Sequence, residues 1–440
     1  MRAFAIMTLV FVSSAIAQDA DVHAIVAAGA GKTIALPDGA YQIDKPIFVT
    51  ADNTVIHGHA TIIQTNPDAD IIRVENAKGV RIEGLTLTRE PGKEDSTGSG
   101  VRAEGCTRLE LSDLHIVNNC SQQGTIYLIK CESSVVRDCE IVNYKRIGVD
   151  DRTASELYGY AFRAIDGTGI QVNETRGLQV INNRVLEERL YATKETKEKY
   201  QLGSFCEGKN PTKKGKLAPP GEYANNWHQG SAITVSSPES TSHVLIGGNL
   251  IRNAAQGIDM HLDNATCSNN IIDHAFIGLK CMHGARNVII ANNTVSHMDL
   301  WGLVMMPGTL AHPAEAASGE KPARGPNYTR GNIIANNIFS DFGLGYERFN
   351  WEQQRSGVIT LDSGQLAENP VMTDVLIEGN VVYDSASDGE LIDGQPQTVG
   401  PRYEWAVYIA QEPSPKGLVF RNNIFHPGKS GVANVSVESK

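Results

Sequence analysis

Short runs of alternating apolar and polar residues recur along most of this chain, and an asparagine joins each run to a second short apolar run. The segments that show this best are "VINNRV" ending at Val185, "LIGGNLI" at Ile251, "CSNNII" at Ile272, "IIANNTV" at Val295, "IIANNIF" at Phe339, "LIEGNVV" at Val382 and "VFRNNIF" at Phe425. The recurring asparagines are Asn183, Asn249, Asn270, Asn293, Asn337, Asn380 and Asn423. Their spacings of 66, 21, 23, 44, 43 and 43 residues are close to multiples of about 22.

A period of this size, with β-branched strands and no helical pattern between them, is typical of a parallel β-helix. Each coil is expected to contribute about three short strands, and the repeated asparagine is expected to face inward and to bond its counterparts above and below. Earlier in the chain, "VRIEGLTL", "LELSDLHI" and "VVRDCEI" place Gly84, Asp113 and Asp138 at the same point of the coil. We predict an all-β fold, a single-stranded right-handed parallel β-helix (a solenoid) with long loop insertions.

The first seventeen residues have the pattern of a secretory signal peptide. One early arginine precedes an apolar run over residues 3–12, and Ala15-Ile16-Ala17 is a cleavage motif, which predicts cutting before Gln18. No later apolar run is long enough to cross a membrane. We therefore expect residues 1–17 to be removed and residues 18–440 to form one β-helix domain, secreted or periplasmic. The segment "ADVHAIVAAGAGKTIALPDGAYQI" departs from the repeat and is interpreted as an N-terminal cap, with a first turn at Pro37-Asp38-Gly39.

Charge and cysteine content narrow the partners. The formal net charge of −11 argues against nucleic acid as a partner. Seven cysteines are too few for a disulfide scaffold. Cys106 and Cys131 fall at matching points of neighbouring repeats, so an exported chain can either join them in a disulfide or stack them as free thiols.

Alternation along one strand of each coil predicts two columns of outward-facing side chains. The first column is Arg102, Tyr127, Gln171, Thr234, Asp259, Lys280 and Val304. The second column is Glu104, Ile129, Asn173, Ser236, His261, Met282 and Met306. Asp259 and His261 should then face solvent on the same side, with Lys280 as a vertical neighbour. Asp259, His261 and Lys280 are therefore either a solvated ion pair on the sheet surface or a catalytic site.

Long insertions flank this group. They span Glu187–Gln229, Pro307–Arg330 and Gly343–Ser356, and they combine basic and aromatic residues. Long loops on a rigid scaffold usually line a site, and rings and cations suit anionic sugars. The residues expected to bind substrate, from these loops and from the columns, are Gln171, Asn173, Thr234, Trp227, His228, His283, Tyr328 and Arg330.

Three residues fit the abstraction of the acidic C5 proton of a uronic acid, which needs a base and a neutralised carboxylate. Lys280 would neutralise the sugar carboxylate, His261 would be the base, and Asp259 would orient His261 or carry charge on the pair. Over nearly its whole mature length, the sequence resembles the right-handed parallel β-helix superfamily typified by pectate lyases, in which enzymes acting on polysaccharides dominate. That resemblance implies the fold and an acidic, uronate-containing polysaccharide as partner.

The stretch "GIDMH", Gly257–His261, more narrowly resembles the Asp-x-His motif of mannuronan C-5 epimerases, whose site adds a basic residue. The resemblance implies catalytic roles for Asp259 and His261, with Lys280 or His283 as the basic residue. Gln256 stands where those enzymes commonly have Tyr, and Met260 replaces the usual Pro. The proton donor is therefore open, with Tyr127, Tyr223 and Tyr328 as candidates, and a lyase fits the motif as well as an epimerase.

Two other functions stay open. A glycoside hydrolase of the polygalacturonase type needs two carboxylates, which Asp150 with Asp151, or Asp259 with Asp263 or Glu174, would supply. A β-helix that binds glycans without catalysis is the third reading. No cofactor is required by any of these chemistries, and no metal ligands are assigned; Ca²⁺ is an option because several lyases of this fold use it.

Overall fold

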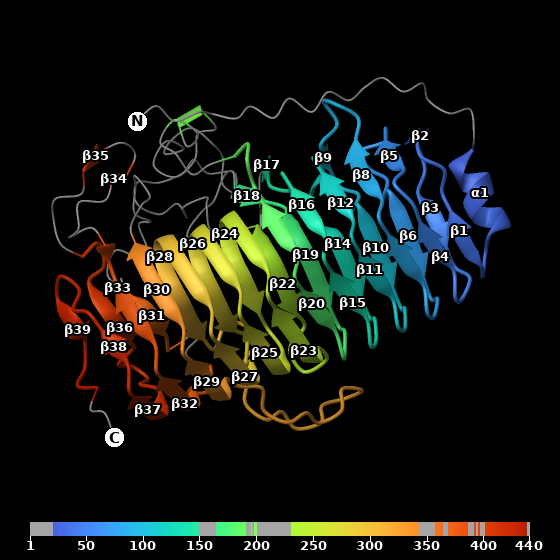
Figure 1. Cartoon of the computed structure of the whole chain (residues 1–440). Coiled ribbons are helices and arrows are strands. Elements are labelled where there is room, and N and C mark those ends of the chain that lie inside the picture. Colours follow the sequence, from blue (N-terminus) through green and yellow to red (C-terminus); the bar gives the residue numbers. More distant parts are fainter. Residues whose placement is uncertain are drawn as a thin grey trace, which may run out of the picture.

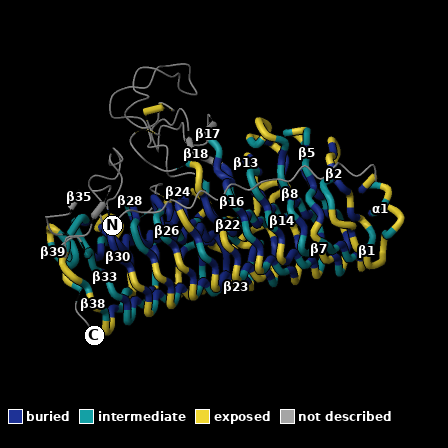
Figure 2. Tube along the Cα trace, turned by 45° about the horizontal axis from the view of Figure 1, so that its top comes forward, coloured by how far each residue is buried: buried dark blue, intermediate teal, exposed yellow. Residues whose placement is uncertain are grey.

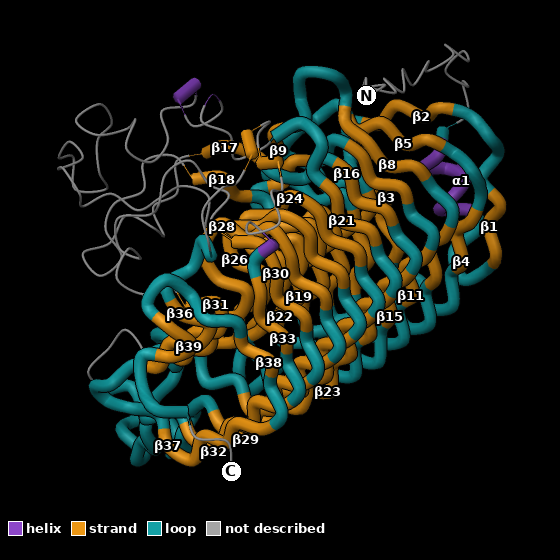
Figure 3. Tube along the Cα trace, turned by 60° about the vertical axis from the view of Figure 1, so that its left-hand side comes forward, coloured by secondary structure: helices purple, strands orange, loops and turns teal. Residues whose placement is uncertain are grey.

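The computed structural model of the chain describes residues 21–148, 164–190, 195, 198, 199, 230–342, 357–363, 368–385, 391, 392, 395, 396 and 401–437. Three ladders of parallel strands run the length of this part of the molecule (Figure 1). Each coil adds one short strand to each ladder, which confirms the predicted all-β parallel β-helix. Turns and loops connect the strands along the edges of the ladders (Figure 3).

The first ladder, which carries the two predicted columns, consists of β3 Ile47–Val49, β6 Ile72–Glu75, β10 Val101–Glu104, β14 Gly124–Ile129, β19 Thr168–Asn173, β22 Ser231–Ser236, β24 Leu250–Met260, β26 Ile271–Met282, β28 Thr294–Met306, β31 Gly357–Leu361, β36 Trp405–Ile409 and β39 Gly431–Ala433. The second ladder consists of β2 Ala40–Ile43, β5 Thr61–Gln64, β8 Thr86–Arg89, β12 His115–Val117, β16 Glu140–Val142, β21 Arg184–Leu186, the first halves of β24, β26 and β28, β30 Ile338–Phe342, β33 Val381–Tyr383 and β38 Ile424–Phe425. Because β24, β26 and β28 each run through both ladders, the two join into one 21-stranded sheet.

The third ladder is a separate 12-stranded sheet. It consists of β1 Thr33–Ala35, β4 Val55–His57, β7 Arg81–Glu83, β11 Glu110–Ser112, β15 Val135–Arg137, β20 Gln179–Ile181, β23 Ser242–Gly247, β25 Asp263–Ser268, β27 Arg286–Ala291, β29 Arg330–Ala335, β32 Thr373–Glu378 and β37 Lys416–Arg421. Three small pairs lie outside the ladders: β9 Asp95–Ser96 with β13 Cys120–Ser121, β17 Arg146–Gly148 with β18 Ala164–Asp166, and β34 Leu391–Ile392 with β35 Gln395–Pro396.

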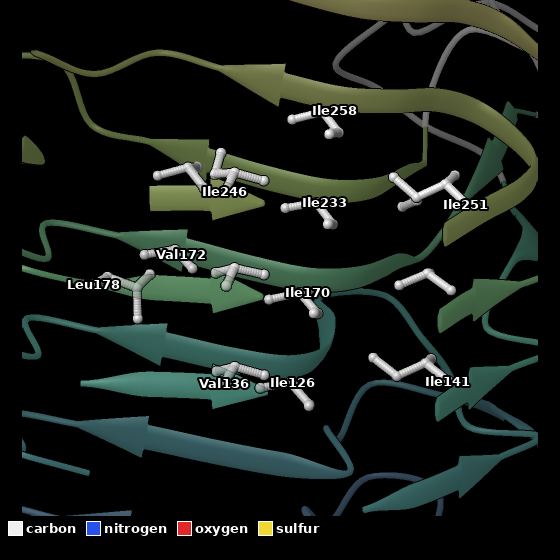
Figure 4. Packing of buried hydrophobic residues seen from close by; sticks show 14 of the residues in the cluster. Ile126, Val136, Ile141, Ile170, Val172, Leu178, Ile233, Ile246, Ile251 and Ile258 are labelled. Atoms are coloured by element: carbon white, nitrogen blue, oxygen red, sulfur yellow. The ribbon is translucent and has the colours of Figure 1, made fainter. Parts of the chain in front are cut away.

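The core lies inside the coils, where each aliphatic side chain stacks on the same position of the next coil. Ile126, Ile170, Ile233 and Ile258 form one such stack in the first ladder, and each is 0% exposed. Figure 4 shows these isoleucines facing matching stacks from the other two ladders. Burying an isoleucine completely contributes about 2 kcal/mol, so the stacks supply the main drive for coiling. Exposed residues concentrate at the turns (Figure 2).

The asparagine ladder is present and continuous from Asn183 to Asn423. Each side-chain amide donates from Nδ2 to the Oδ1 of the next asparagine, over distances of 2.9 to 3.1 Å. The same Oδ1 atoms accept the backbone N–H of the asparagine in the coil before. The inward-facing ladder predicted from the sequence is confirmed.

The predicted extension of this ladder to Gly84, Asp113 and Asp138 is wrong by one residue. Glu140 pairs with Arg184, so Asp138 is level with Asn182 rather than with Asn183. These positions form a neighbouring column with positive φ, between 53° and 75° for Gly84, Asp113 and Asp138. Glycine, asparagine and aspartate tolerate this left-handed conformation better than other residues, which explains why the pattern looked continuous in the sequence.

The N-terminal cap contains a helix that the sequence pattern did not predict. Helix α1, Val22–Ala28, lies at the N-terminal end of the stack (Figure 1) and buries Val22 and Val26. Asp21 caps it by accepting the backbone N–H of His23. At seven residues it is too short for a helical period to stand out.

Other sequence expectations have mixed outcomes. Cys106 and Cys131 are buried free thiols on adjacent coils.

Residues 1–17 lie outside the described part of the chain, as do most residues of the insertions over 187–229 and 343–356. The insertion over 307–330 is described, and its residues 312–327 fold back on themselves as a loop beside the third ladder (Figure 1). Within the described residues, no helix has the length and apolar character needed to cross a membrane.

The asparagine ladder should be a measurable source of stability. Asn270→Ala removes an amide that donates to Asn293 and accepts from Asn249, and it leaves buried backbone groups without partners. We expect the free energy of unfolding to fall by about 3 kcal/mol, measured by urea denaturation. The control is Asn269→Gly, next in sequence but exposed and at a φ of 59°, which should change stability by less than about 0.5 kcal/mol. Equal effects of the two substitutions would contradict a stabilising ladder.

Candidate active site

The two outward columns predicted from alternation exist in the structure. Strand pairing aligns Arg102 with Tyr127, Tyr127 with Gln171, Gln171 with Thr234, Thr234 with Asp259, Asp259 with Lys280 and Lys280 with Val304. The second column follows the same register from Glu104 through Ile129 and Asn173 to Ser236. The parallel stacking of the first ladder therefore determines which polar side chains meet.

Asp259, His261 and Lys280 form one connected ionic group. Asp259 Oδ1 lies 2.7 Å from Nε2 of His261, two residues along the same strand face. Asp259 Oδ2 lies 3.3 Å from the ammonium of Lys280, in the next coil. Each oxygen of the carboxylate thus has one basic partner. The sequence spacing places the three side chains on one face, but it does not show that they are in contact.

Polar side chains from the adjoining strand and from β24 support the group. Ser236 Oγ lies 3.0 Å from Nδ1 of His261. Lys280 also donates to Oε1 of Gln256 at 3.3 Å, and Ser231 donates to the same oxygen at 3.3 Å. Gln256, which in the sequence stands out only as a departure from a motif, occupies the coil position beside Ser231 in the pairing register.

His283 closes the group from the turn after β26. Its ring packs edge-on against that of His261, with 4.4 Å between the ring centroids. The backbone N–H of Leu310 donates to its Nδ1 at 3.3 Å, and Asn327 donates to its carbonyl at 2.9 Å. His283 has a φ of 60°, in the left-handed region that histidine tolerates, and these two hydrogen bonds connect it to the 307–330 insertion.

The group is more buried than an outward column predicts. Asp259 is 6% exposed and His261 is 7% exposed, so the expectation that they face open solvent is wrong. Burial by itself raises the pKa of Asp259, but the charges of His261 and Lys280 outweigh it and hold the pKa well below its usual range. The carboxylate is therefore ionised in a largely dry position, where its contacts are stronger than on a solvated sheet.

An apolar cluster bounds the group on the side of the later coils. Its buried members are Phe276, Ile277, Met282, Trp301, Val304 and Met306, and Leu190 and Leu300 pack against it. Val304 follows Lys280 in the first column and is 0% exposed. The first column is therefore apolar directly after Lys280, and it becomes polar again at Thr360 and Tyr408.

Apart from His283, which contacts His261, the residues expected to bind substrate divide into three sets. Gln171, Asn173 and Thr234 continue the polar columns toward the N-terminus. Tyr328 and Arg330 instead contact each other at the start of β29 in the third ladder, with 2.9 Å between their polar atoms. No contact of that pair with the Asp259 group occurs among the described residues, so the expectation that they line the site is not supported. The remaining two, Trp227 and His228, lie outside the described residues.

Candidates for other roles are also placed. Tyr127 is three strands from Asp259, about 14 Å away, too far to donate a proton to the same sugar unit. Asp263 lies at the start of β25 in the third ladder, where it pairs with Arg286. Asp150, Asp151 and Tyr223 lie outside the described residues.

A metal-binding group is not found among the residues that the structure describes. No three or more His, Cys, Asp or Glu side chains there are arranged to hold an ion. His261 and His283 do meet, but His297 pairs with Asp273 instead. The use of Ca²⁺ stays a prediction.

Comparison with known proteins supports the fold. A family described as "Right handed beta helix region" matches residues 47–196. The structure resembles an exopolygalacturonase from Thermotoga maritima (11% identity, 91% of this chain and 85% of that one, TM-score 0.52). It also resembles DFA-IIIase from Arthrobacter chlorophenolicus A6 in complex with GF2 (12% identity, 93% and 87%, TM-score 0.56) and the alginate lyase AlyF-OU02 in complex with G6 (12% identity, 95% and 86%, TM-score 0.50).

No curated protein matches the chain by sequence. At these identities the likeness establishes the architecture alone, and it confirms the right-handed parallel β-helix predicted from the repeat. The three similar structures are described as acting on or binding different carbohydrates, so the choice of reaction depends on the residues of this chain.

The partly buried His283 should make the protein sensitive to mild acid. Burial, and then the charges of His261 and Lys280, lower the pKa of His283 to about 2, against about 6.5 in an unfolded chain. Between these values the unfolded state binds the extra proton, so stability falls as the pH falls below about 6.5, by about 1.4 kcal/mol per pH unit. From pH 7 to pH 5 we expect a loss of about 2 kcal/mol from this residue.

The comparison protein for that measurement is His283→Asn, because asparagine tolerates a φ of 60° and does not titrate in this range. Urea denaturation of both proteins at pH 7 and pH 5 should show the larger loss in the unmodified chain. Parallel losses would mean that His283 is protonated in the folded protein.

Proposed function

We propose that Asp259, His261 and Lys280 abstract the C5 proton of a uronate unit in an acidic polysaccharide, as a lyase or a C-5 epimerase. One observation carries the proposal: an ionised, buried carboxylate contacts a histidine through one oxygen and a lysine through the other. That arrangement supplies an oriented base and a fixed positive charge within one sugar unit of each other.

The contacts of His261 favour a defined tautomer. An ionised carboxylate has no proton to donate and attracts one, so we assign the ring proton to Nε2, which lies 2.7 Å from Asp259 Oδ1, although this contact lacks the angle of a hydrogen bond. Nδ1 then carries the lone pair, and the hydroxyl of Ser236 donates to it. Rotation of Ser236 about a single bond frees this lone pair for the C5 proton, while Asp259 stabilises the imidazolium that forms.

Lys280 would act on the negative charge that develops in the substrate. When C5 loses its proton to His261, the electron pair moves onto the neighbouring carboxylate, and a nearby ammonium stabilises that charge. Lys280 donates to Asp259 and Gln256 and keeps a third N–H for the sugar. Return of a proton to the opposite face completes an epimerisation, whereas loss of the C4 oxygen completes a lyase reaction. Tyr223 is the remaining proposed proton donor.

The same contacts also suggest a second candidate, an acyl transfer. Ser236, His261 and Asp259 have the order of nucleophile, base and orienting acid, with 3.0 Å and 2.7 Å between successive members. A carbohydrate esterase of this kind would cleave ester groups on a polysaccharide. We prefer C5 chemistry because the esterase reading gives Lys280 no role, whereas proton abstraction uses all three charged groups.

An exported location, secreted or periplasmic, belongs to the proposal. It is supported by the apolar run of residues 3–12 and the small residues at Ala15-Ile16-Ala17. An acidic polysaccharide is accessible in those compartments.

The proposal predicts proton exchange without a metal cofactor being added. The mature protein would be incubated with alginate, pectate and glycosaminoglycans in deuterated buffer, and proton NMR and ultraviolet absorbance would be followed. Deuterium at C5 without new absorbance indicates an epimerase, and absorbance from an unsaturated product indicates a lyase. His261→Ala should lower either rate by about a thousandfold. New reducing ends with neither signal would identify a hydrolase instead.

Ser236→Ala separates the two candidate chemistries. Under C5 chemistry the substitution frees Nδ1 of His261, so the rate should stay within about threefold of the unmodified enzyme. Under acyl transfer it removes the nucleophile, and release of acetate or methanol from esterified alginate or pectin should stop. Lys280→Met provides the complementary variant, since it should impair C5 chemistry strongly, with Lys280→Arg as the charge-conserving control.

A further inference from the structure

A second polar group lies on the same face, toward the N-terminus. It consists of Arg102, Tyr127 and Asn173, in three successive strands of the first ladder. The guanidinium of Arg102 lies over the ring of Tyr127, 5.4 Å from its centroid, and Asn173 donates to the tyrosine hydroxyl at 3.2 Å. These contacts hold the aromatic ring in a fixed orientation beside the polar columns.

Two polar atoms of this group have no partner within the part of the chain that the structure describes. They are Nε of Arg102, a donor, and Oδ1 of Asn173, an acceptor, and both atoms are buried. A buried polar atom without a hydrogen bond costs about 1 to 3 kcal/mol, which a ligand can recover by bonding to it. The side chain of Arg102 remains 30% exposed, so a ligand lying along the face reaches the group.

The chemistry of the group suits one sugar unit. A ring that is apolar on its face and polar at its hydroxyl packs against a pyranose, and donors and acceptors at its edge bind sugar oxygens. Arg102 also has an ion pair with Glu104 at 3.4 Å, so its charge is partly offset. Its side chain is nonetheless 30% exposed, so the guanidinium can pair with an acceptor such as a uronate carboxylate.

The position of the group relates it to the Asp259 site. Tyr127 and Asp259 are three strands apart, about 14 Å, and because a pyranose is about as long as one strand spacing, this corresponds to about three sugar units. Gln171 and Thr234 fill the intervening positions of the column with polar side chains. On the other side of Lys280 the column continues with Val304 and Thr360, both 0% exposed, before it reaches Tyr408. Among the described residues, the partly exposed polar positions nearest to the site therefore lie toward the N-terminal coils.

We propose that Arg102, Tyr127 and Asn173 form a distal subsite that binds a uronate unit about three units from the one held at Asp259. The bound glycan would run from Lys280 toward the N-terminal coils. This inference rests on the proposed function, because it takes the same acidic glycan as ligand.

Chain-length dependence of binding tests the subsite. Binding of oligomannuronates and oligogalacturonates, from disaccharide to hexasaccharide, would be measured by calorimetry with His261→Ala, which binds without turnover. Affinity should rise between trisaccharide and pentasaccharide and then level off. Tyr127→Leu should remove that rise, weakening pentasaccharide binding about tenfold and leaving disaccharide binding unchanged.

Matched variants make the result specific. Arg102→Met and Asn173→Ala should act like Tyr127→Leu, whereas Gln179→Ala, exposed in the third ladder, should have no effect on any oligomer. Thermal unfolding of each variant would verify that the β-helix remains folded. If reduction of the sugar carboxylates to alcohols leaves the pentasaccharide affinity unchanged, the subsite does not recognise a uronate and the inference is wrong.

Failure of the subsite and failure of the proposed function give different results. Binding that does not depend on length, or a Tyr127→Leu effect equal for all lengths, overturns the subsite and leaves the C5 chemistry standing. No binding of any oligouronate, together with no deuterium exchange in the active protein, overturns both. Exchange at C5 with length-independent binding would place the glycan on Lys280 without a distal contact.

Discussion

In-register stacking of identical coil positions is the constraint on which the structure depends. Each strand bonds to the equivalent strand of the next coil, so a side chain has its counterparts directly above and below it. Aliphatic positions stack into the core, and the asparagines from Asn183 to Asn423 bond through 2.9 to 3.1 Å contacts between side chains. A shift of one residue would turn each core side chain outward and break the ladder at once.

The same stacking builds the candidate site. Asp259 comes from β24 and His261 follows directly after the end of that strand, whereas Ser236 comes from the strand before and Lys280 from the strand after. Their separations are therefore determined by strand spacing and alternation rather than by flexible loops. A rigid backbone of this kind suits chemistry that needs a base and a charge at fixed positions around one sugar.

Charge and polarity change along the first ladder, and the site lies at the change. Before Lys280 the outward positions are polar, and arginine, tyrosine and asparagine side chains continue the face toward the N-terminal coils. The next outward positions after Lys280, Val304 and Met306, belong to the buried apolar cluster around Trp301, and the first column becomes polar again at Thr360 and Tyr408. This apolar layer lowers the local dielectric at Asp259.

The sequence by itself determined the β-helix, the inward asparagines and the two outward columns, because a period near 22 residues and a two-residue alternation fix both stacking and facing. It did not separate Asn182 from Asn183, since positive-φ positions and ladder positions use the same residue types. Nor did it predict the burial of Asp259, the role of Gln256, or the 2.7 Å contact between Asp259 and His261. Those depend on how side chains of separate coils and of the 307–330 insertion pack together. Such contacts join residues that are far apart in the chain, so no local pattern records them, and only the tertiary structure decided that these side chains form one group.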